Sequence, residues 1–288
     1  MEPLQSFWVP YKTDASYIEV GDTRMALNTA NNAGGLNPVN GGAMRLTWGG
    51  SGSGFAQLYR SDFESHEADD GGAIWTSVET DITACSFRSN EALDRGGAID
   101  ASGSALRFKN AYISNNQADV GGAIWADADL VIAYSTVIDN SYAASGSAIL
   151  VAEDIEIGGS ILDNGLNDSC QLVGLGGSLD MDDSVVTDDD AAAGNQNGCE
   201  DASSTNVLFS TRSDLELSAS ETPATSPAQN YTRLLKTIAP PNPPSDAKDH
   251  VTPVGGACPA VGTSITTDYD ANARPGTGDC DAGSHEES

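Results

Sequence analysis

The tetrapeptide Gly-Gly-Ala-Ile at residues 71–74 decides the fold, because it returns at 96–99, at 121–124 and, as Gly-Ser-Ala-Ile, at 146–149. Each copy begins 25 residues after the one before it. A related Gly-Gly-Ala-Met at 41–44 lies 30 residues upstream and indicates the same unit with a longer loop. A fixed period of roughly 20 to 50 residues is typical of repeat proteins.

A second element runs between these copies, an apolar residue followed three positions later by Asn or a substitute. Its spacing stays between 24 and 26 residues, so two independent landmarks share one period. The copies are Phe63/His66, Phe87/Asn90, Ile113/Asn116, Val137/Asn140, Ile161/Asn164 and Val185/Asp188.

Apolar and polar residues alternate in stretches such as Leu106-Arg107-Phe108-Lys109, which is the period of a β-strand. A unit of this size cannot bury an apolar face alone, whereas units stacked about 4.8 Å apart let each strand pair with its equivalent in the next coil. We therefore predict an all-β fold, a parallel β-helix (solenoid) of about 25 residues per coil with a short N-terminal cap.

The stacking predicts columns of equivalent residues. The apolar members of the second element form one inward column, and the isoleucines of the tetrapeptides form another. The Gly pair permits a sharp turn with positive φ. Asn tolerates a corner and its amide can bond the Asn of the next coil, which predicts a structural ladder with His66 at its start. The ladder residues are Asn90, Asn116, Asn140 and Asn164.

The alternation of G-G-A-I with an apolar-x-x-N element resembles the polymorphic outer membrane protein repeat of bacterial surface proteins over residues 41–190. The resemblance implies a right-handed parallel β-helix. The ending, with Cys258-Pro259, Asp268 and Asp270, Arg274-Pro275 and Cys280, resembles that of choice-of-anchor Q domains. It departs from their pattern at Ala271 and after Asp281, and no anchor segment follows.

These patterns divide the chain into four parts. Residues 1–40 are the expected N-terminal cap, with a candidate short helix at 23–32. Residues 41–215 are the β-helix, 216–250 a Ser/Thr/Pro-rich connector, and 251–288 a disulfide-closed ending packed on the β-helix.

Five cysteines, none in a C-x-x-C pair, suggest two disulfides and one free thiol if the protein is exported. Cys170 and Cys199 lie 29 residues apart, about one coil, and Cys258 and Cys280 close the ending. Cys85 is the leftover thiol and is expected to be buried and unreactive. The N-terminus has no signal-peptide pattern, so either a signal peptide has been removed, which we favour, or the chain is cytosolic.

The charge of the chain is strongly negative: 42 Asp plus Glu against 13 Lys plus Arg give a formal net charge of −29. This argues against nucleic acid and anionic membranes as partners, because both need clustered Lys and Arg. No apolar stretch is long enough for a transmembrane segment. Hard cations bind several oxygens, so Ca²⁺ is a candidate ligand, although no EF-hand spacing occurs. Its candidate ligands are Asp180, Asp182, Asp188, Asp189, Asp268 and Asp270.

Residues that follow the inward isoleucines should point outward, giving a column of Trp75, Asp100, Trp125 and Leu150. Two exposed indoles with a carboxylate between them would make a sugar-stacking platform. The alternative is that the rings are covered. Carboxylates suited to a glycoside hydrolase occur at 180–190, although in so acidic a chain such a cluster is most often a solvated face. Arg107 and Lys109 are isolated candidates for the cationic base of a lyase.

We expect an exported bacterial surface protein that acts as a non-catalytic, adhesin-like scaffold, for adhesion to glycans or for self-assembly with other copies of itself. The second hypothesis is a carbohydrate-active enzyme, a polysaccharide lyase or glycoside hydrolase, on the same β-helix, because fold alone does not decide function.

Overall fold

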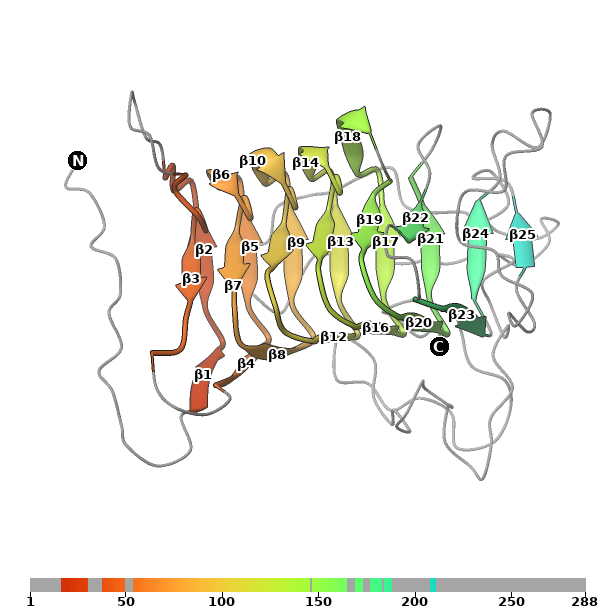
Figure 1. Ribbon diagram of the computed structural model, residues 1–288, viewed down its shortest axis with the longest axis horizontal. Helices are drawn as coiled ribbons and strands as arrows, with labels where there is room; N and C mark the ends of the chain where they lie inside the picture. Colours follow the sequence, from red (N-terminus) through yellow and green to blue (C-terminus); the bar gives the residue numbers. More distant parts are fainter. Residues whose placement is uncertain are drawn as a thin grey trace, which may run out of the picture.

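The computed structural model describes residues 17–30, 38–49, 54–145, 147–164, 169–172, 177–182, 184–187 and 208–210. These residues contain strands and turns and no helix. Every strand pairing is parallel, and in most pairings the partners lie about 25 residues apart, so the chain winds into a stacked solenoid (Figure 1). The predicted all-β fold class and coil length are confirmed.

The coils contribute strands to four sheets, which we call A, B, C and D in chain order. Sheet A contains β1 (Tyr17–Gly21), β4 (Phe55–Tyr59), β8 (Glu79–Thr83), β12 (Leu106–Lys109), β16 (Leu130–Ala133), β20 (Ile155–Gly158) and β23 (Leu179–Asp182). Sheet B contains β2 (Arg24–Ala26), β5 (Asp62–Glu64), β9 (Ser86–Arg88), β13 (Tyr112–Ser114), β17 (Thr136–Ile138), β21 (Ile161–Asp163), β24 (Val185–Thr187) and β25 (Leu208–Ser210).

Sheets C and D complete each coil. Sheet C contains β6 (Glu67–Asp70), β10 (Glu91–Arg95), β14 (Gln117–Val120) and β18 (Ser141–Ser145). Sheet D contains β3 (Met44–Leu46), β7 (Ile74–Thr76), β11 (Ile99–Ala101), β15 (Ile124–Ala126), β19 (Ile149–Val151) and β22 (Cys170–Leu172). The Gly-Gly-Ala-Ile copies therefore lead from sheet C into sheet D.

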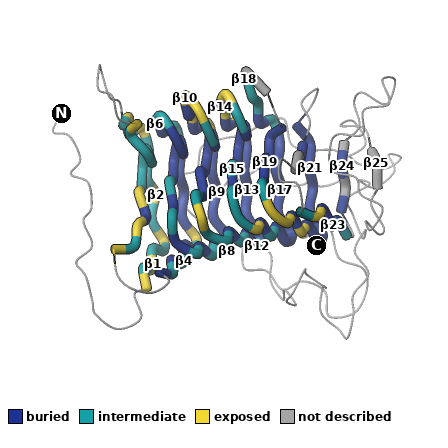
Figure 2. Tube along the Cα trace, viewed as in Figure 1, coloured by how far each residue is buried: buried dark blue, intermediate teal, exposed yellow. Residues whose placement is uncertain are grey.

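The interior of the solenoid is a continuous apolar core, which the buried strand segments of Figure 2 outline. The isoleucine column is confirmed, since Ile74, Ile99, Ile124 and Ile149 pair in register and are fully buried. In sheet B, Phe63 stacks on Phe87 with ring centroids 4.9 Å apart and 5° between their planes. The next rungs are Ile113 and Val137.

The predicted membership of the sheet B column is wrong at its C-terminal end. Val137 pairs with Leu162, and Leu162 pairs with Val186, whereas Ile161 pairs with Thr136. Ile161 and Leu162 are both fully buried, but only Leu162 belongs to the core cluster. Because the outer face of this strand is also buried, apolar character alone could not identify the inward residue.

The two glycines of the repeat have different roles. The first one, such as Gly96 with φ of 63°, adopts the left-handed conformation that we predicted. The second one lies against the next coil: a Cβ at Gly97 would stand 2.1 Å from the carbonyl oxygen of Gly122. Close approach of two backbones, rather than a positive φ, therefore requires the second glycine.

The N-terminal region differs from the prediction. Strands β1 and β2 pair in parallel with β4 and β5, so residues 17–26 are part of the first coil and not a separate cap. The helix expected at 23–32 is wrong over Arg24–Ala26, which is a strand. Pairing with Asp62, Phe63 and Glu64 in the next coil overrides the weak helical pattern of this segment. Residues 1–16 lie outside the described part of the chain.

Candidate functional site

The predicted asparagine ladder is present at the corner between sheets B and C. The side-chain oxygen of Asn116 accepts hydrogen bonds from the backbone N–H of Asn90 (3.0 Å) and from its Nδ2 (2.9 Å). Asn116 Nδ2 donates in turn to Phe87 O and to Asn140 Oδ1. Asn140 makes the equivalent bonds to Asn164. Because these residues are buried, their polar groups are satisfied by one another rather than by water.

His66 occupies the ladder position of its coil, as predicted. Its backbone N–H donates to Asn90 Oδ1 at 3.0 Å, and its Nδ1 accepts from the backbone N–H of Asn28 at 3.2 Å. The side chain is fully buried, and burial lowers its pKa to about 4. A neutral imidazole in a turn supports the structural role that the sequence predicts.

Replacing His66 by Asn should make the protein less sensitive to acid. The pKa of His66 is lower in the folded chain (about 4) than the reference value of 6.5, so the unfolded chain binds more protons between these values. The wild type therefore loses stability as pH falls from 6.5 toward 4. At pH 5 this loss is about 2 kcal/mol. Urea unfolding at pH 5 and pH 7.5 should show a relative gain for His66→Asn only at pH 5; an equal difference at both values would contradict this role.

A second ladder, which the sequence reasoning missed, lies at the turn between sheets A and B. Hydroxyl groups occupy this turn in most coils, at Thr23, Ser61, Ser135, Ser160 and Ser184. Ser135 Oγ accepts from the backbone N–H of Ala111 (3.0 Å), and Ser160 Oγ accepts from that of Ser135 (3.1 Å). Each serine also donates to the carbonyl two residues earlier, for example Ser135 Oγ to Ala133 O at 3.0 Å.

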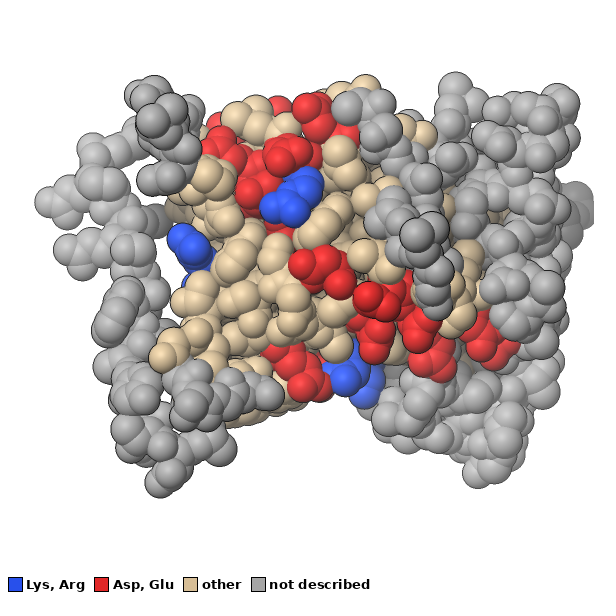
Figure 3. Space-filling model, viewed as in Figure 1, with Lys and Arg blue, Asp and Glu red and all other residues tan. Residues whose placement is uncertain are grey.

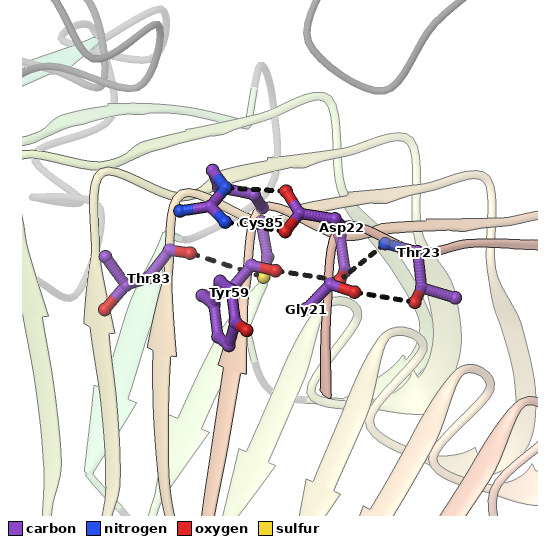
Figure 4. A network of polar contacts seen from close by, with 8 residues as sticks. Gly21, Asp22, Thr23, Tyr59, Thr83 and Cys85 are labelled. Carbon is purple, nitrogen blue, oxygen red and sulfur yellow. Dashed lines mark hydrogen bonds and ion pairs between the residues drawn. The ribbon is translucent and has the colours of Figure 1, made fainter. Parts of the chain in front are cut away.

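Cys85 stands in this hydroxyl column, and Figure 4 shows its surroundings. Its thiol donates to Thr83 O at 3.5 Å, as Ser61 Oγ donates to Tyr59 O at 2.9 Å. Cys85 is a free thiol and is fully buried, and burial raises its pKa to about 12. The predicted burial of this free thiol is confirmed, and its low reactivity stays a prediction. Cys85 takes the place of a serine in a structural turn.

The tryptophan column is the outward row of sheet D, formed by Arg45, Trp75, Asp100, Trp125 and Leu150. Asp100 pairs in register with Trp75 on one side and with Trp125 on the other, as predicted. Both indoles are half-buried, and a guanidinium lies over each ring, Arg45 at 4.9 Å from the Trp75 centroid and Arg95 at 4.3 Å from that of Trp125. Cation–π contacts of this kind hold the rings in place.

The carboxylate between the indoles is not exposed, contrary to the expectation for an open platform. Asp100 is fully buried; its Oδ1 accepts from Ser102 Oγ at 2.8 Å, and its Oδ2 lies 3.3 Å from Arg95 Nη2. Leu150, at the C-terminal end of the column, is 4 % exposed. The surface of the column therefore consists of the two indoles and the arginines that cover them.

The candidate calcium ligands fall into two groups. Asp180 and Asp182 share the outward face of β23, where Asp180 is in register with Glu156. Burial, and then the charges of Asp180 and Asp182, raise the pKa of Glu156. Within the described ranges, no set of three or more His, Cys, Asp or Glu side chains is arranged to hold a metal ion. The other candidates, Asp188, Asp189, Asp268 and Asp270, lie outside those ranges, so calcium binding stays a prediction.

Several other predictions also concern residues beyond the described ones. They include the connector at 216–250, the ending at 251–288 and the Cys258–Cys280 pair. Cys170 is fully buried and disulfide-bonded, and Cys199, its predicted partner, lies outside the described residues.

On the face of the molecule shown in Figure 3, the charged side chains of the described residues are mostly acidic, with few basic groups between them. Arg107, a lyase candidate from the sequence, is engaged by two carboxylates: its Nη1 contacts Glu79 and lies 3.3 Å from Asp81 Oδ1. A base that must accept a proton from substrate cannot be a guanidinium held in this way. Among the described residues, none forms a helix that would be long and apolar enough to cross a membrane.

Fold and surface together define this protein as a parallel β-solenoid with a half-buried tryptophan column on one sheet. Comparison of the chain with protein-family models, with curated proteins and with solved structures finds no match.

Proposed function

We propose that the protein is an exported, non-catalytic scaffold of the bacterial cell surface, adhesin-like, whose tryptophan column is its contact surface for glycans. The resemblance of its repeats to polymorphic outer membrane proteins supports this proposal. The disulfide at Cys170 supports export as well, because disulfides persist in oxidising compartments.

The observation that carries the proposal is that two carboxylates close to the indoles are buried and paired with Arg95. A glycosidase needs two carboxyl groups that reach the substrate, one to donate a proton and one to attack or activate water. Asp70 and Asp100, two acids that pair with the Arg95 guanidinium over Trp125, have side chains that are 6 % and 0 % exposed. They hold an arginine and do not face solvent, which favours a binding surface over an active site.

The enzyme alternative rests on the acidic row of sheet A. Glu156, Asp180 and Asp182 share one outward face there, and burial, followed by the charges of Asp180 and Asp182, raises the pKa of Glu156. This row lies on a different sheet from the indoles of sheet D. We therefore rank catalysis second.

A screen of glycans and polysaccharides, scored for both binding and cleavage, tests the proposal. We expect the full chain to bind at least one glycan and to cleave none. The double variant Trp75→Ala/Trp125→Ala should weaken that binding about tenfold or more, because each lost aromatic contact contributes roughly 1 kcal/mol. Gln117→Ala, an exposed position on β14, is the matched control and should bind as the wild type does.

Each other outcome has a clear meaning. Unchanged binding by the double variant would remove the tryptophan column from the proposal. Cleavage that disappears in Asp180→Asn would replace the scaffold by the enzyme. If no glycan binds and sedimentation shows larger species at higher concentration, self-assembly is the function of the scaffold.

A further inference from the structure

Arg95, the last residue of β10, connects three successive coils through its guanidinium. Its Nε lies 3.4 Å from Asp70 Oδ1 in the preceding coil, and its Nη2 lies 3.3 Å from Asp100 Oδ2 in its own coil. The guanidinium carbon lies 4.3 Å from the ring centroid of Trp125 in the following coil. The same group is thus both an ion-pair partner of two buried acids and the cover of an indole.

Asp100 is an unusual member of this cluster because its ionisable side chain is fully buried. Burial raises its pKa to about 7, although the hydrogen bond from Ser102 and the charge of Arg95 oppose this shift. The negative charges of Asp70 and Asp127 raise the pKa further. Oδ2 of Asp100 accepts no hydrogen bond within the described residues, and the Arg95 cation is its close partner.

The charged groups around Asp100 come from each neighbouring element. Sheet C provides Asp70 from β6, and Arg95 and Asp94 from β10; Asp94 Oδ2 lies 3.8 Å from Arg95 Nε. Asp127, in the turn after β15, raises the pKa of Asp100 by its charge. Arg95 is the cation that pairs with Asp100, so the charge of Asp100 sets how strongly the guanidinium is drawn toward the tryptophan column.

We propose that Arg95 is a proton-controlled latch on Trp125, which covers the indole while Asp100 is ionised and leaves it when Asp100 takes up a proton. Once Asp100 is neutral, the carboxylates that attract Arg95 are Asp70 and Asp94. Asp70 belongs to a coil two steps, or about 10 Å, from that of Trp125, so its attraction moves the guanidinium away from the ring. Acidification then uncovers one aromatic face of the column.

This inference deepens the proposed function, because it gives the same column a regulated, acid-favoured state. The latch itself is measured without any glycan, so its failure and the failure of the adhesin proposal are separate results. If the latch titrates but no glycan binds at any pH, only the proposed function is overturned.

Fluorescence of Trp125 alone provides the test. The full chain carrying Trp8→Phe, Trp48→Phe and Trp75→Phe is titrated between pH 5.5 and pH 8.5, with acrylamide quenching at each step. We expect the quenching constant to rise about twofold toward low pH as the cation–π cover is lost. The midpoint should lie near 7. Far-UV circular dichroism over the same range verifies that the solenoid stays folded.

Three further variants in this background identify the groups. Asp100→Asn, which is neutral at every pH, should be quenched at the acid-state level throughout, and so should Arg95→Ala, which has no cover. Ser102→Ala removes a hydrogen bond that lowers the pKa of Asp100, so its midpoint should move to higher pH. Quenching that does not change with pH in the parent, or an unchanged titration in Asp100→Asn, would overturn the proposal.

Discussion

Gly97→Ala is expected to destroy the folded solenoid. The added Cβ would lie 2.1 Å from Gly122 O and 2.5 Å from Gln117 O, and both are backbone atoms of the next coil. Neither can move without breaking backbone hydrogen bonds between the two coils, such as the one that Gly97 N–H donates to Gly121 O at 3.3 Å. The cost is of the order of the whole free energy of unfolding of a domain, about 5–15 kcal/mol.

Far-UV circular dichroism and urea unfolding measure this effect. The matched control is Gly49→Ala, where an added Cβ meets nothing within 4 Å and the backbone has no positive φ. That variant should remain within about 0.5 kcal/mol of the wild type. A folded Gly97→Ala protein with near-normal stability would mean that successive coils are not packed backbone against backbone at this corner.

Asn116→Ala should cost about 4 kcal/mol, the second largest effect we expect, because several buried groups lose partners at once. The backbone N–H and Nδ2 of Asn90 lose their acceptor, and the carbonyl of Phe87 and the side-chain oxygen of Asn140 lose a donor. Urea unfolding at pH 7.5 gives the difference directly.

The neighbouring substitution Gln117→Ala serves as its control. Gln117 is exposed, so its loss should change the free energy of unfolding by less than about 0.5 kcal/mol. Equal small effects of both substitutions would contradict a dry, cooperative ladder and would leave the asparagine column without a stabilising role.

The sequence could predict the solenoid because its two repeated motifs, Gly-Gly-Ala-Ile and the apolar residue followed by Asn, occupy positions of the coil where the backbone restricts the residue type. Glycine is required where two backbones meet, and at the corner between sheets B and C a short amide can bond the equivalent residue of the next coil. At the N-terminus this signal fades, since residues 17–26 lack both landmarks and join the first coil through pairing with β4 and β5.

The sequence also contains a signal that identifies Leu162, and not Ile161, as the member of the sheet B core column. In the hydroxyl column, the turn residue stands two positions before the inward apolar residue, as Ser61 does before Phe63 and Ser135 before Val137. The same spacing from Ser160 leads to Leu162 and not to Ile161. Apolar character could not decide between them, because both side chains are buried.

The tryptophan column was predictable in its register but not in its exposure. Strand alternation places Trp75, Asp100 and Trp125 on one outward row, which the pairing confirms. Arg95, however, reaches this row from sheet C, and the periodic pattern of sheet D does not predict its contact with Trp125. Contacts between different sheets of a coil depend on the conformation that a long side chain adopts at the corner, and the sequence spacing does not specify this conformation.

Distances between spin labels test the stacking of coils most directly. In a Cys85→Ser background, one pair replaces Gln57 and Glu156, which lie four coils apart in a single register, and a second pair replaces Glu19 and Asp180, six coils apart. A rise of about 4.8 Å per coil predicts separations of about 19 Å and about 29 Å. Separations that do not grow in proportion to the number of intervening coils would contradict the stacked solenoid and the surface column built on it.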